Sequence, residues 1–307
     1  MEWIIARWVT FLTTLLAVGA CAVGVGLVPR LVADEGERAA IARESARIGV
    51  VACLLLIPAS VLRLADQLLA LRAPGDPVMS GLTPLITSTM WGAGFVWQSM
   101  AGLVALAGFR VATHTPRAPR AWAVAVAGSA VLGATLSLQG HAIGTETLTA
   151  VAVAADVTHV LGAGVWLGGI GVIGWMGVAL PDSDGYADPV QRARAEARLK
   201  QLVPLVPAAA LTGAAALVAS GVASSLLHLR AVDDLWASRW GQLLVVKVVL
   251  LTAIAGFGAL NWQRLGRRLA EAEGTRALRR SLLIEIGIAL VALLVTSLLV
   301  VTPLPGE

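Results

Sequence analysis

Eight long apolar stretches recur along the 307-residue chain and restrict the folds that it can adopt. A helix needs about 20 apolar residues to cross a hydrocarbon layer of ~30 Å, and these stretches reach that length. They lack the polar–apolar alternation of outer-membrane strands, and a bilayer accepts only helices or closed barrels. Hydrophobic residues make up 57% of the chain and charged residues 14%, which excludes an ordinary soluble domain. We predict an all-α polytopic membrane helix bundle with about eight transmembrane helices, covering residues 5–28, 48–71, 84–109, 121–140, 151–180, 201–227, 240–262 and 281–302.

The connections between these stretches are too short to fold separately. The longest cover residues 29–47, 181–200 and 263–280, about twenty residues each. Segments of this length do not supply a hydrophobic core of their own. Residues 1–307 are therefore expected to form a single integral membrane domain.

Lysine and arginine are distributed unequally between the connections on the two sides of the predicted bundle. Connections 29–47, 110–120, 181–200 and 263–280 together hold seventeen of them, whereas the three alternating connections hold three. Because cytoplasmic loops retain an excess of Lys and Arg, we predict that both termini lie on the extracytoplasmic side. The net charge of +4 therefore reflects topology and gives no reason to expect a nucleic-acid partner.

An acid and a histidine lie three residues apart inside the fifth apolar stretch, in the segment ADVTHVLGAGVWLGGI at 155–170. A polar group in hydrocarbon is costly unless it is paired, hydrated or coordinating something. Asp156 and His159 share a helix face, and His141 directly follows the fourth stretch, so both imidazoles are expected in the outer half of the membrane. Neutral imidazole is a good copper ligand, and a carboxylate on its second nitrogen fixes the tautomer. The pattern indicates a metal site built from His141 and His159, with Asp156 in support.

A purely structural role also accounts for these residues. Membrane histidines form hydrogen bonds between helices, and Asp156 is equally suited to an ion pair with another helix. Lys247 lies at a comparable depth in the seventh stretch, so a pair with Asp156 would explain both charges. The sequence leaves both interpretations open.

Further candidate ligands fall on the same side of the membrane. Met79, Met90 and His228 lie in outer loops or at outer helix ends, which allows a mixed nitrogen–sulfur site. Methionines in helices also commonly fill gaps in packing. Cys21 and Cys53 fall in the inner halves of adjacent helices without a CxxC motif, where they fit either a soft exit site or buried packing.

The series GHA at 140–142, followed by D-x-x-H and V-W-L-G-G at 156–169, resembles the central signature of the copper resistance protein D (CopD) family of bacterial membrane proteins. The C-terminal third adds a W-G-x-L-L-x-x-K helix start, an ALNWQRL helix end and an R-R-x-x-x-x-E helix that leads to proline. The resemblance is specific over roughly residues 130–305. Residues 1–120 match it only in hydrophobicity and general arrangement.

This resemblance implies copper transport and resistance at the bacterial inner membrane, with copper ions moved between periplasm and cytoplasm. Carried over residue by residue, the family histidines fall on His141 and His159, and the Trp-Gly-Gly positions on Trp166, Gly168 and Gly169. The implied partners are the lipid bilayer and copper ions, as Cu(I) or Cu(II), with a periplasmic copper carrier as a further candidate. The sequence departs from this expectation in having no methionine-rich outer segment that would collect Cu(I).

Two other functions compete with copper transport. A b-type haem held between His141 and His159 would make the chain an electron-transfer protein, although both histidines are expected near one membrane face. A membrane assembly factor or scaffold would use a metal site structurally or lack one. An enzyme is not expected, because no nucleophile–base pair or glycine-rich phosphate loop is recognisable.

Overall fold

The structure, a computed structural model, describes residues 2–71, 75, 77–137, 149–178, 190, 197–198, 201–202, 204–229, 231–265 and 272–305. Over these residues it consists of helices and connections, without a strand. Eight described segments are long and apolar enough to cross a membrane, as predicted. They are Ile4–Leu31, Glu35–Leu71, Met90–His114, Pro119–Ser137, Ala150–Gly177, Leu205–Leu227, Arg239–Leu260 and Arg280–Leu299. The all-α, multi-pass fold is therefore confirmed.

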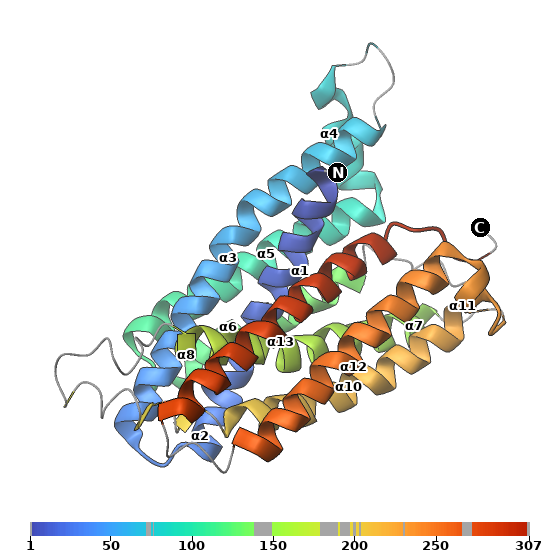
Figure 1. The fold of residues 1–307 in the computed structure, drawn as a ribbon. Helices are drawn as coiled ribbons and strands as arrows, with labels where there is room; N and C mark the ends of the chain where they lie inside the picture. Colours follow the sequence, from blue (N-terminus) through green and yellow to red (C-terminus); the bar gives the residue numbers. More distant parts are fainter. Residues whose placement is uncertain are drawn as a thin grey trace.

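The helices lie side by side in one elongated bundle (Figure 1). The N-terminal half contains α1 (Glu2–Cys21), η1 (Ala22–Leu27), α2 (Val28–Leu31), α3 (Glu35–Leu71), η2 (Val78–Gly81), α4 (Leu82–Ser88), α5 (Met90–His114) and α6 (Pro119–Ser137). The C-terminal half contains α7 (Thr149–Ala163), η4 (Gly164–Gly168), α8 (Gly169–Val178), α10 (Leu205–His228), α11 (Asp234–Ala237), α12 (Arg239–Leu265) and α13 (Ala272–Leu299). Figure 1 shows both termini at the same end of the bundle, as an even number of spans requires. That this end faces away from the cytoplasm stays a prediction.

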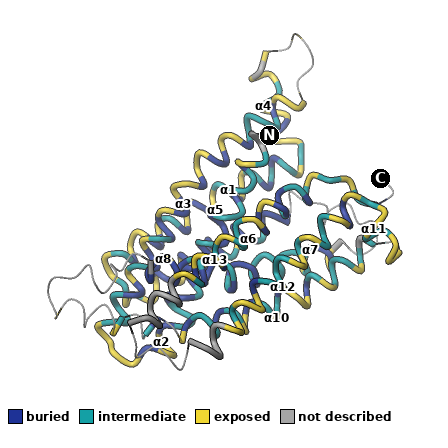
Figure 2. Tube along the Cα trace, viewed as in Figure 1, coloured by how far each residue is buried: buried dark blue, intermediate teal, exposed yellow. Residues whose placement is uncertain are grey.

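Helix α1 is the central element of the bundle. It packs against α3, α6, η4 and α13, and 61% of the residues in its spanning window are buried. The Trp8 indole Nε1 donates a hydrogen bond to the carbonyl oxygen of Leu290 on α13, 2.9 Å away. In α12 only 6% of the spanning window is buried, so this helix lies at the periphery with most of its surface uncovered (Figure 2).

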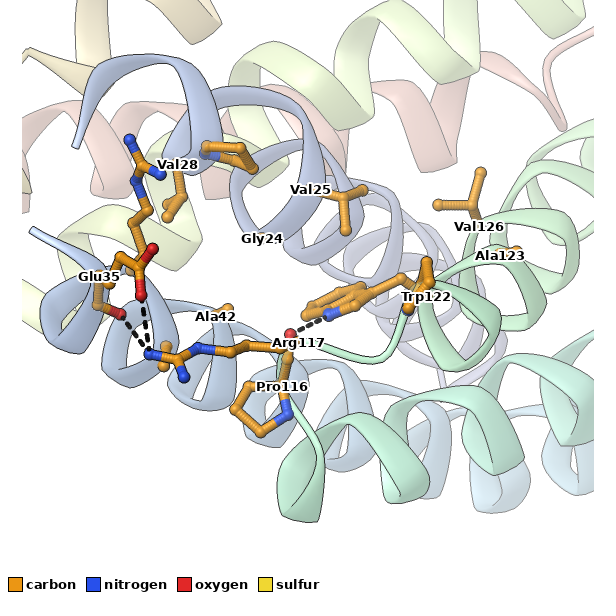
Figure 3. A pocket seen from close by; sticks show the side chains of 14 residues that line it. Gly24, Val25, Val28, Glu35, Ala42, Pro116, Arg117, Trp122, Ala123 and Val126 are labelled. Carbon is orange, nitrogen blue, oxygen red and sulfur yellow. Dashed lines mark hydrogen bonds and ion pairs between the residues drawn. The ribbon is translucent and has the colours of Figure 1, made fainter. Parts of the chain in front are cut away.

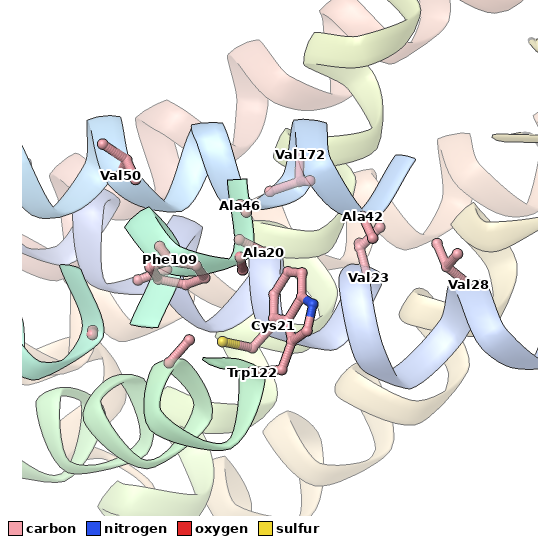
Figure 4. Packing of buried hydrophobic residues seen from close by; sticks show 14 of the residues in the cluster. Ala20, Cys21, Val23, Val28, Ala42, Ala46, Val50, Phe109, Trp122 and Val172 are labelled. Carbon is pink, nitrogen blue, oxygen red and sulfur yellow. The ribbon is translucent and has the colours of Figure 1, made fainter. Parts of the chain in front are cut away.

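Two clusters of buried side chains hold the bundle together. The first joins α1, α3, α5, α6 and α8 and includes Phe109 and Trp122, whose rings meet edge to face at 6.1 Å (Figure 4). The second joins α1, η4, α8, α10, α12 and α13 around Trp166 and Leu217. Lipid tails provide no hydrophobic drive between helices, so close packing of this kind supplies the association. The second cluster directly underlies the polar groups described below.

Glycines bring the backbones of α1 and η4 into direct contact. A β-carbon added at Gly168 would lie 2.6 Å from the carbonyl carbon of Leu15, and one added at Gly19 would lie 2.6 Å from the backbone nitrogen of Gly169. Real β-carbons do not approach backbone atoms this closely. Small residues are therefore required at this crossing, as in other tightly packed membrane helices.

The structure differs from the sequence prediction at residues 29–47, which we expected to connect two spans. α3 already begins at Glu35, so only a short turn separates it from α2. The Asp34 side chain caps it by accepting a hydrogen bond from the backbone N–H of Glu37 at 2.7 Å. This cap, together with Glu35 and Glu37 in the positively polarised first turn, favours a helix in a segment too polar for a span.

The third predicted span, 84–109, is divided. α4 ends at Ser88, Thr89 adopts an extended conformation, and α5 runs from Met90 to His114. The Thr89 hydroxyl oxygen accepts a hydrogen bond from the backbone N–H of Gly92 at 2.9 Å. A threonine N-cap therefore starts the spanning helix six residues later than hydropathy alone predicts.

Candidate metal site

His159 lies on α7, and its imidazole reaches α10. The ring Nδ1 is 3.1 Å from the carbonyl oxygen of Leu217 and 3.3 Å from the hydroxyl oxygen of Ser220. Ser220 donates its own hydroxyl proton to the carbonyl oxygen of Ala216 at 2.6 Å. Both neighbours of Nδ1 therefore accept, which assigns the ring proton to Nδ1 and the lone pair to Nε2.

This environment is typical of metal-binding histidines. Such a histidine usually donates its second ring N–H to a carbonyl or carboxylate, which orients the ring and makes the other nitrogen a better ligand. We expected Asp156 in this role. The Leu217 carbonyl fills it instead, because Nδ1 faces α10 whereas Asp156 lies one turn away on α7.

Lys247 approaches the other side of the imidazole from α12. Its Nζ is 3.3 Å from Nε2 of His159. Since Nε2 has a lone pair and no proton, Lys247 is the donor. Asp156 is close enough to attract the Lys247 charge. The polar side chains of α7, α10 and α12 thus converge around one imidazole.

The three helices place this cluster well inside their lengths, away from the helix ends. His159 lies ten residues into α7, Lys247 eight residues into α12, and Ser220 eight residues before the end of α10. At 1.5 Å per residue these positions are about 12–15 Å from the helix ends. With the helix ends at the surface of a hydrocarbon layer of ~30 Å, the cluster would lie at the inner limit of the half predicted for it.

Small residues allow α7 and α10 to approach closely enough for this contact. A β-carbon at Gly162 would lie 2.8 Å from the backbone nitrogen of Leu217, and one at Gly213 would lie 2.7 Å from the β-carbon of Trp166. Only glycine permits so short a distance between the backbones of the two helices. This close approach brings the Leu217 carbonyl within reach of His159.

Replacement of Gly221 by valine is expected to disturb the site without unfolding the bundle. A β-carbon at this position would lie 3.1 Å from Cε1 and 3.3 Å from Nδ1 of His159. The further methyl groups of valine would push the ring away from Leu217, so we expect copper affinity to fall about 10-fold, as after loss of an orienting partner. A copper titration measures this effect. Gly256→Val is the control, since Gly256 has open space beside it, and equal losses in both variants would refute the explanation.

Trp166, Gly168 and Gly169, expected as supporting residues, occupy packing positions. Trp166 is buried within the second cluster. Gly168 lies against the Leu15 carbonyl, and a β-carbon at Gly169 would lie 3.2 Å from the β-carbon of Ala209 on α10. The contacts that η4 makes with α1 and α10 therefore explain the V-W-L-G-G motif as a packing requirement.

Three of the candidate ligands lie away from the His159 ring. Met79 on η2 is 64% exposed and Met90 at the start of α5 is 57% exposed; Figure 1 shows α4, between them, well separated from α7. His228 ends α10, about 12 Å of helix beyond Ser220. His141, the second predicted ligand, lies outside the described residues, so its distance from His159 stays a prediction.

Glu285 on α13 is a polar residue to which the sequence assigned no definite role. It is buried, and the Ser281 hydroxyl donates a hydrogen bond to its Oε1 at 3.4 Å. A β-carbon at Gly258 of α12 would lie 3.7 Å from its Oε2. It also lines a small cavity of about 40 Å³ between α1, α8, α12 and α13. Since Gly258 lies eleven residues beyond Lys247, this carboxylate is about 16 Å deeper along α12 than the His159 cluster.

A second group of charges lies in the N-terminal half. Arg63 on α3 is buried, and it interacts electrostatically with Asp66 one turn later and with Arg7 on α1. Both arginines also act on the Asp66 carboxylate, so Arg7, Arg63 and Asp66 form one charged group. These residues contain no metal-binding nitrogen or sulfur atom.

Cys21 and Cys53 are buried in the first cluster. Cys21 lies beside Trp122 (Figure 4), and its thiol contacts the Ser129 hydroxyl at 3.5 Å. The surrounding side chains are apolar. Their position supports the packing interpretation of these two thiols.

A larger pocket of about 600 Å³ opens beyond the C-terminal end of α1, between α2, the start of α3 and the start of α6 (Figure 3). An ion pair crosses it, with Arg117 Nη2 at 3.7 Å from the Glu35 carboxylate. The Trp122 indole donates to the Pro116 carbonyl oxygen at 2.9 Å in its wall. The pocket is lined without histidine, cysteine or methionine, so it offers copper none of its preferred nitrogen or sulfur ligands.

No group of three or more His, Cys, Asp and Glu side chains suited to a metal ion occurs among the residues that the structure describes. His159 is therefore the one histidine of the predicted pair whose surroundings are defined.

Two protein-family models match the chain. Residues 1–151 match the model described as copper resistance protein D-like, N-terminal domain, and residues 201–299 match copper resistance protein D. The first match gives the N-terminal helices a family character that the sequence analysis did not find in them. Residues 152–200, which contain Asp156, His159 and Trp166, lie between the matched ranges. No curated protein and no solved structure matches the chain.

Proposed function

Because the chain belongs to the copper resistance protein D family, we propose that it is an inner-membrane protein that carries copper ions between periplasm and cytoplasm, with His159 as the central ligand. The observation that carries this proposal is the orientation of His159. Its Nδ1–H is fixed on α10, and its Nε2 lone pair faces Lys247 Nζ on α12.

His141 is the proposed second ligand. It would join His159 from the connection between α6 and α7. Met79, Met90 and His228, which belong to the outer end of the bundle in the predicted topology, are proposed to capture copper before it reaches this pair. A periplasmic copper carrier would deliver the ion at the same end.

Glu285 is the proposed next station for an ion that leaves His159. Acidic residues buried in a membrane commonly mark ion pathways, and this carboxylate of α13 lies deeper beside α12, the helix that carries Lys247. Its oxygens would stabilise a cation between the His159 level and the other membrane face.

Copper flux into proteoliposomes tests this function. Vesicles containing the wild-type chain and an internal copper-sensitive dye are expected to take up copper, and His159→Ala is expected to lower the rate by about 10-fold or more. His114→Ala removes an exposed histidine at the end of α5 and serves as the matched control. Flux no faster than in protein-free vesicles would contradict the proposal.

Glu285→Gln separates copper passage from copper binding. The substitution keeps the shape of the side chain and removes its charge, so we expect copper binding at His159 to persist while flux falls by about 10-fold. A binding titration and the flux assay on the same preparation provide the two readouts. Unchanged flux would exclude Glu285 from the path.

A further inference from the structure

We propose that Lys247 is a built-in competitor for the copper site: its side-chain nitrogen holds the His159 lone pair when the site is empty, and copper binds only after Lys247 has moved toward Asp156. This inference rests on the proposed function, because it takes Nε2 of His159 as a copper ligand. It adds a regulatory element to that ligand.

The competition follows from the single lone pair of a neutral imidazole. Nδ1 is committed as a donor to Leu217 at 3.1 Å, so Nε2 is the ring's remaining coordinating atom. Lys247 Nζ lies 3.3 Å from that atom and donates to it. One lone pair serves either the lysine proton or a metal ion, so the two states exclude each other.

Charge reinforces this exclusion. A lysine ammonium and a copper ion are both cations, and their repulsion is strong in a membrane interior with little water. Copper at Nε2 therefore favours displacement of Lys247. Asp156 provides a destination, since it lies near enough to attract the lysine charge and is one turn from His159 on α7.

The position of Lys247 allows such a movement. Its ammonium lies at the end of a flexible four-carbon chain. The helix that carries it, α12, is buried over only 6% of its spanning window. Much of the surface of α12 is therefore not packed against other helices of the chain.

Lys247→Met is the direct test, because it removes the donor and the charge while keeping an unbranched apolar chain. We expect the affinity for copper, titrated as Cu(I) and as Cu(II) against a coloured chelator, to rise at least about 10-fold, the equivalent of one charge-assisted hydrogen bond. Arg239→Met, which removes an exposed cation from the same helix, should leave the affinity unchanged. A gain in affinity is not a result that unfolding produces.

Asp156→Asn in both backgrounds tests the destination of Lys247. In the wild-type background it should weaken copper binding, because the lysine loses its alternative partner. In the Lys247→Met background it should have no effect, and this non-additivity identifies Asp156 as a positioning residue. Equal weakening in both backgrounds would instead make Asp156 a ligand and overturn this part of the proposal.

The outcomes distinguish failure of this inference from failure of the proposed function. His159-dependent copper binding that is unchanged or weaker in Lys247→Met would overturn the competitor role and leave the copper site standing; weaker binding would identify Lys247 as a ligand. Copper binding that is absent, or independent of His159, in every variant would overturn both.

Discussion

Replacing His159 with alanine is expected to lower copper affinity by more than about 100-fold, because loss of an orienting partner alone costs about 10–100-fold and this change removes the ligand itself. The side chain is the only described imidazole placed between α7, α10 and α12. Alanine offers no coordinating atom, and Asp156 still attracts the Lys247 charge. The measurement is a competition titration of the purified protein with a copper chelator.

Two controls accompany the His159→Ala variant. His114→Ala removes a histidine that is exposed at the end of α5 and should bind copper as the wild type does. Thermal unfolding should show that His159→Ala remains folded, since α7 and α10 keep their backbone contact through Gly162 and Gly213. Wild-type affinity in the His159→Ala variant would place the copper site elsewhere.

Gly168→Leu should have the largest effect on stability. Any side chain at this position meets the Leu15 carbonyl group, and a β-carbon would lie 2.6 Å from its carbon atom. Backbone cannot move aside as a flexible side chain does, so α1 and η4 must separate. We expect a loss of about 3 kcal/mol or more, which lowers the midpoint of thermal unfolding by at least roughly 5 °C.

The matched control for this substitution is Gly256→Leu. Gly256 lies on α12 with open space around its α-carbon, so the same change should leave the unfolding midpoint within roughly 2 °C of the wild type. Differential scanning fluorimetry in detergent compares the two variants directly. Similar midpoints for both would show that the α1–η4 contact is not tight in the folded protein.

The spans could be predicted from the sequence because a helix that crosses the hydrocarbon layer needs about 20 apolar residues in a row, and hydropathy detects such a stretch. The ends of α3 and α5 could not, since they depend on caps by Asp34 and Thr89 rather than on hydropathy. A polar segment that continues as helix outside the hydrocarbon layer has no distinct hydropathy pattern. For this reason hydropathy did not predict that α3 begins at Glu35, within the connection expected at 29–47.

The candidate site could be predicted only in part. His159 and Asp156 are recognisable because a polar pair inside an apolar run is unusual. The Leu217 carbonyl is not, since a backbone atom 58 residues away leaves no signal in residue type. Ser220 and Gly221 within the sixth span were a signal of close helix packing, but their contact with His159 depends on the crossing of α7 and α10. For Lys247 the depth could be predicted from the sequence, but not the atom that it contacts, 88 residues away.

The X-ray absorption spectrum of the copper-loaded protein tests the central claim most directly. The ligand that we assign is an imidazole nitrogen of His159, so the wild type should show the multiple-scattering pattern of histidine bound to copper, and His159→Ala should lose or reduce it. A spectrum without imidazole scattering, or one that is identical in the variant, would contradict copper binding at His159.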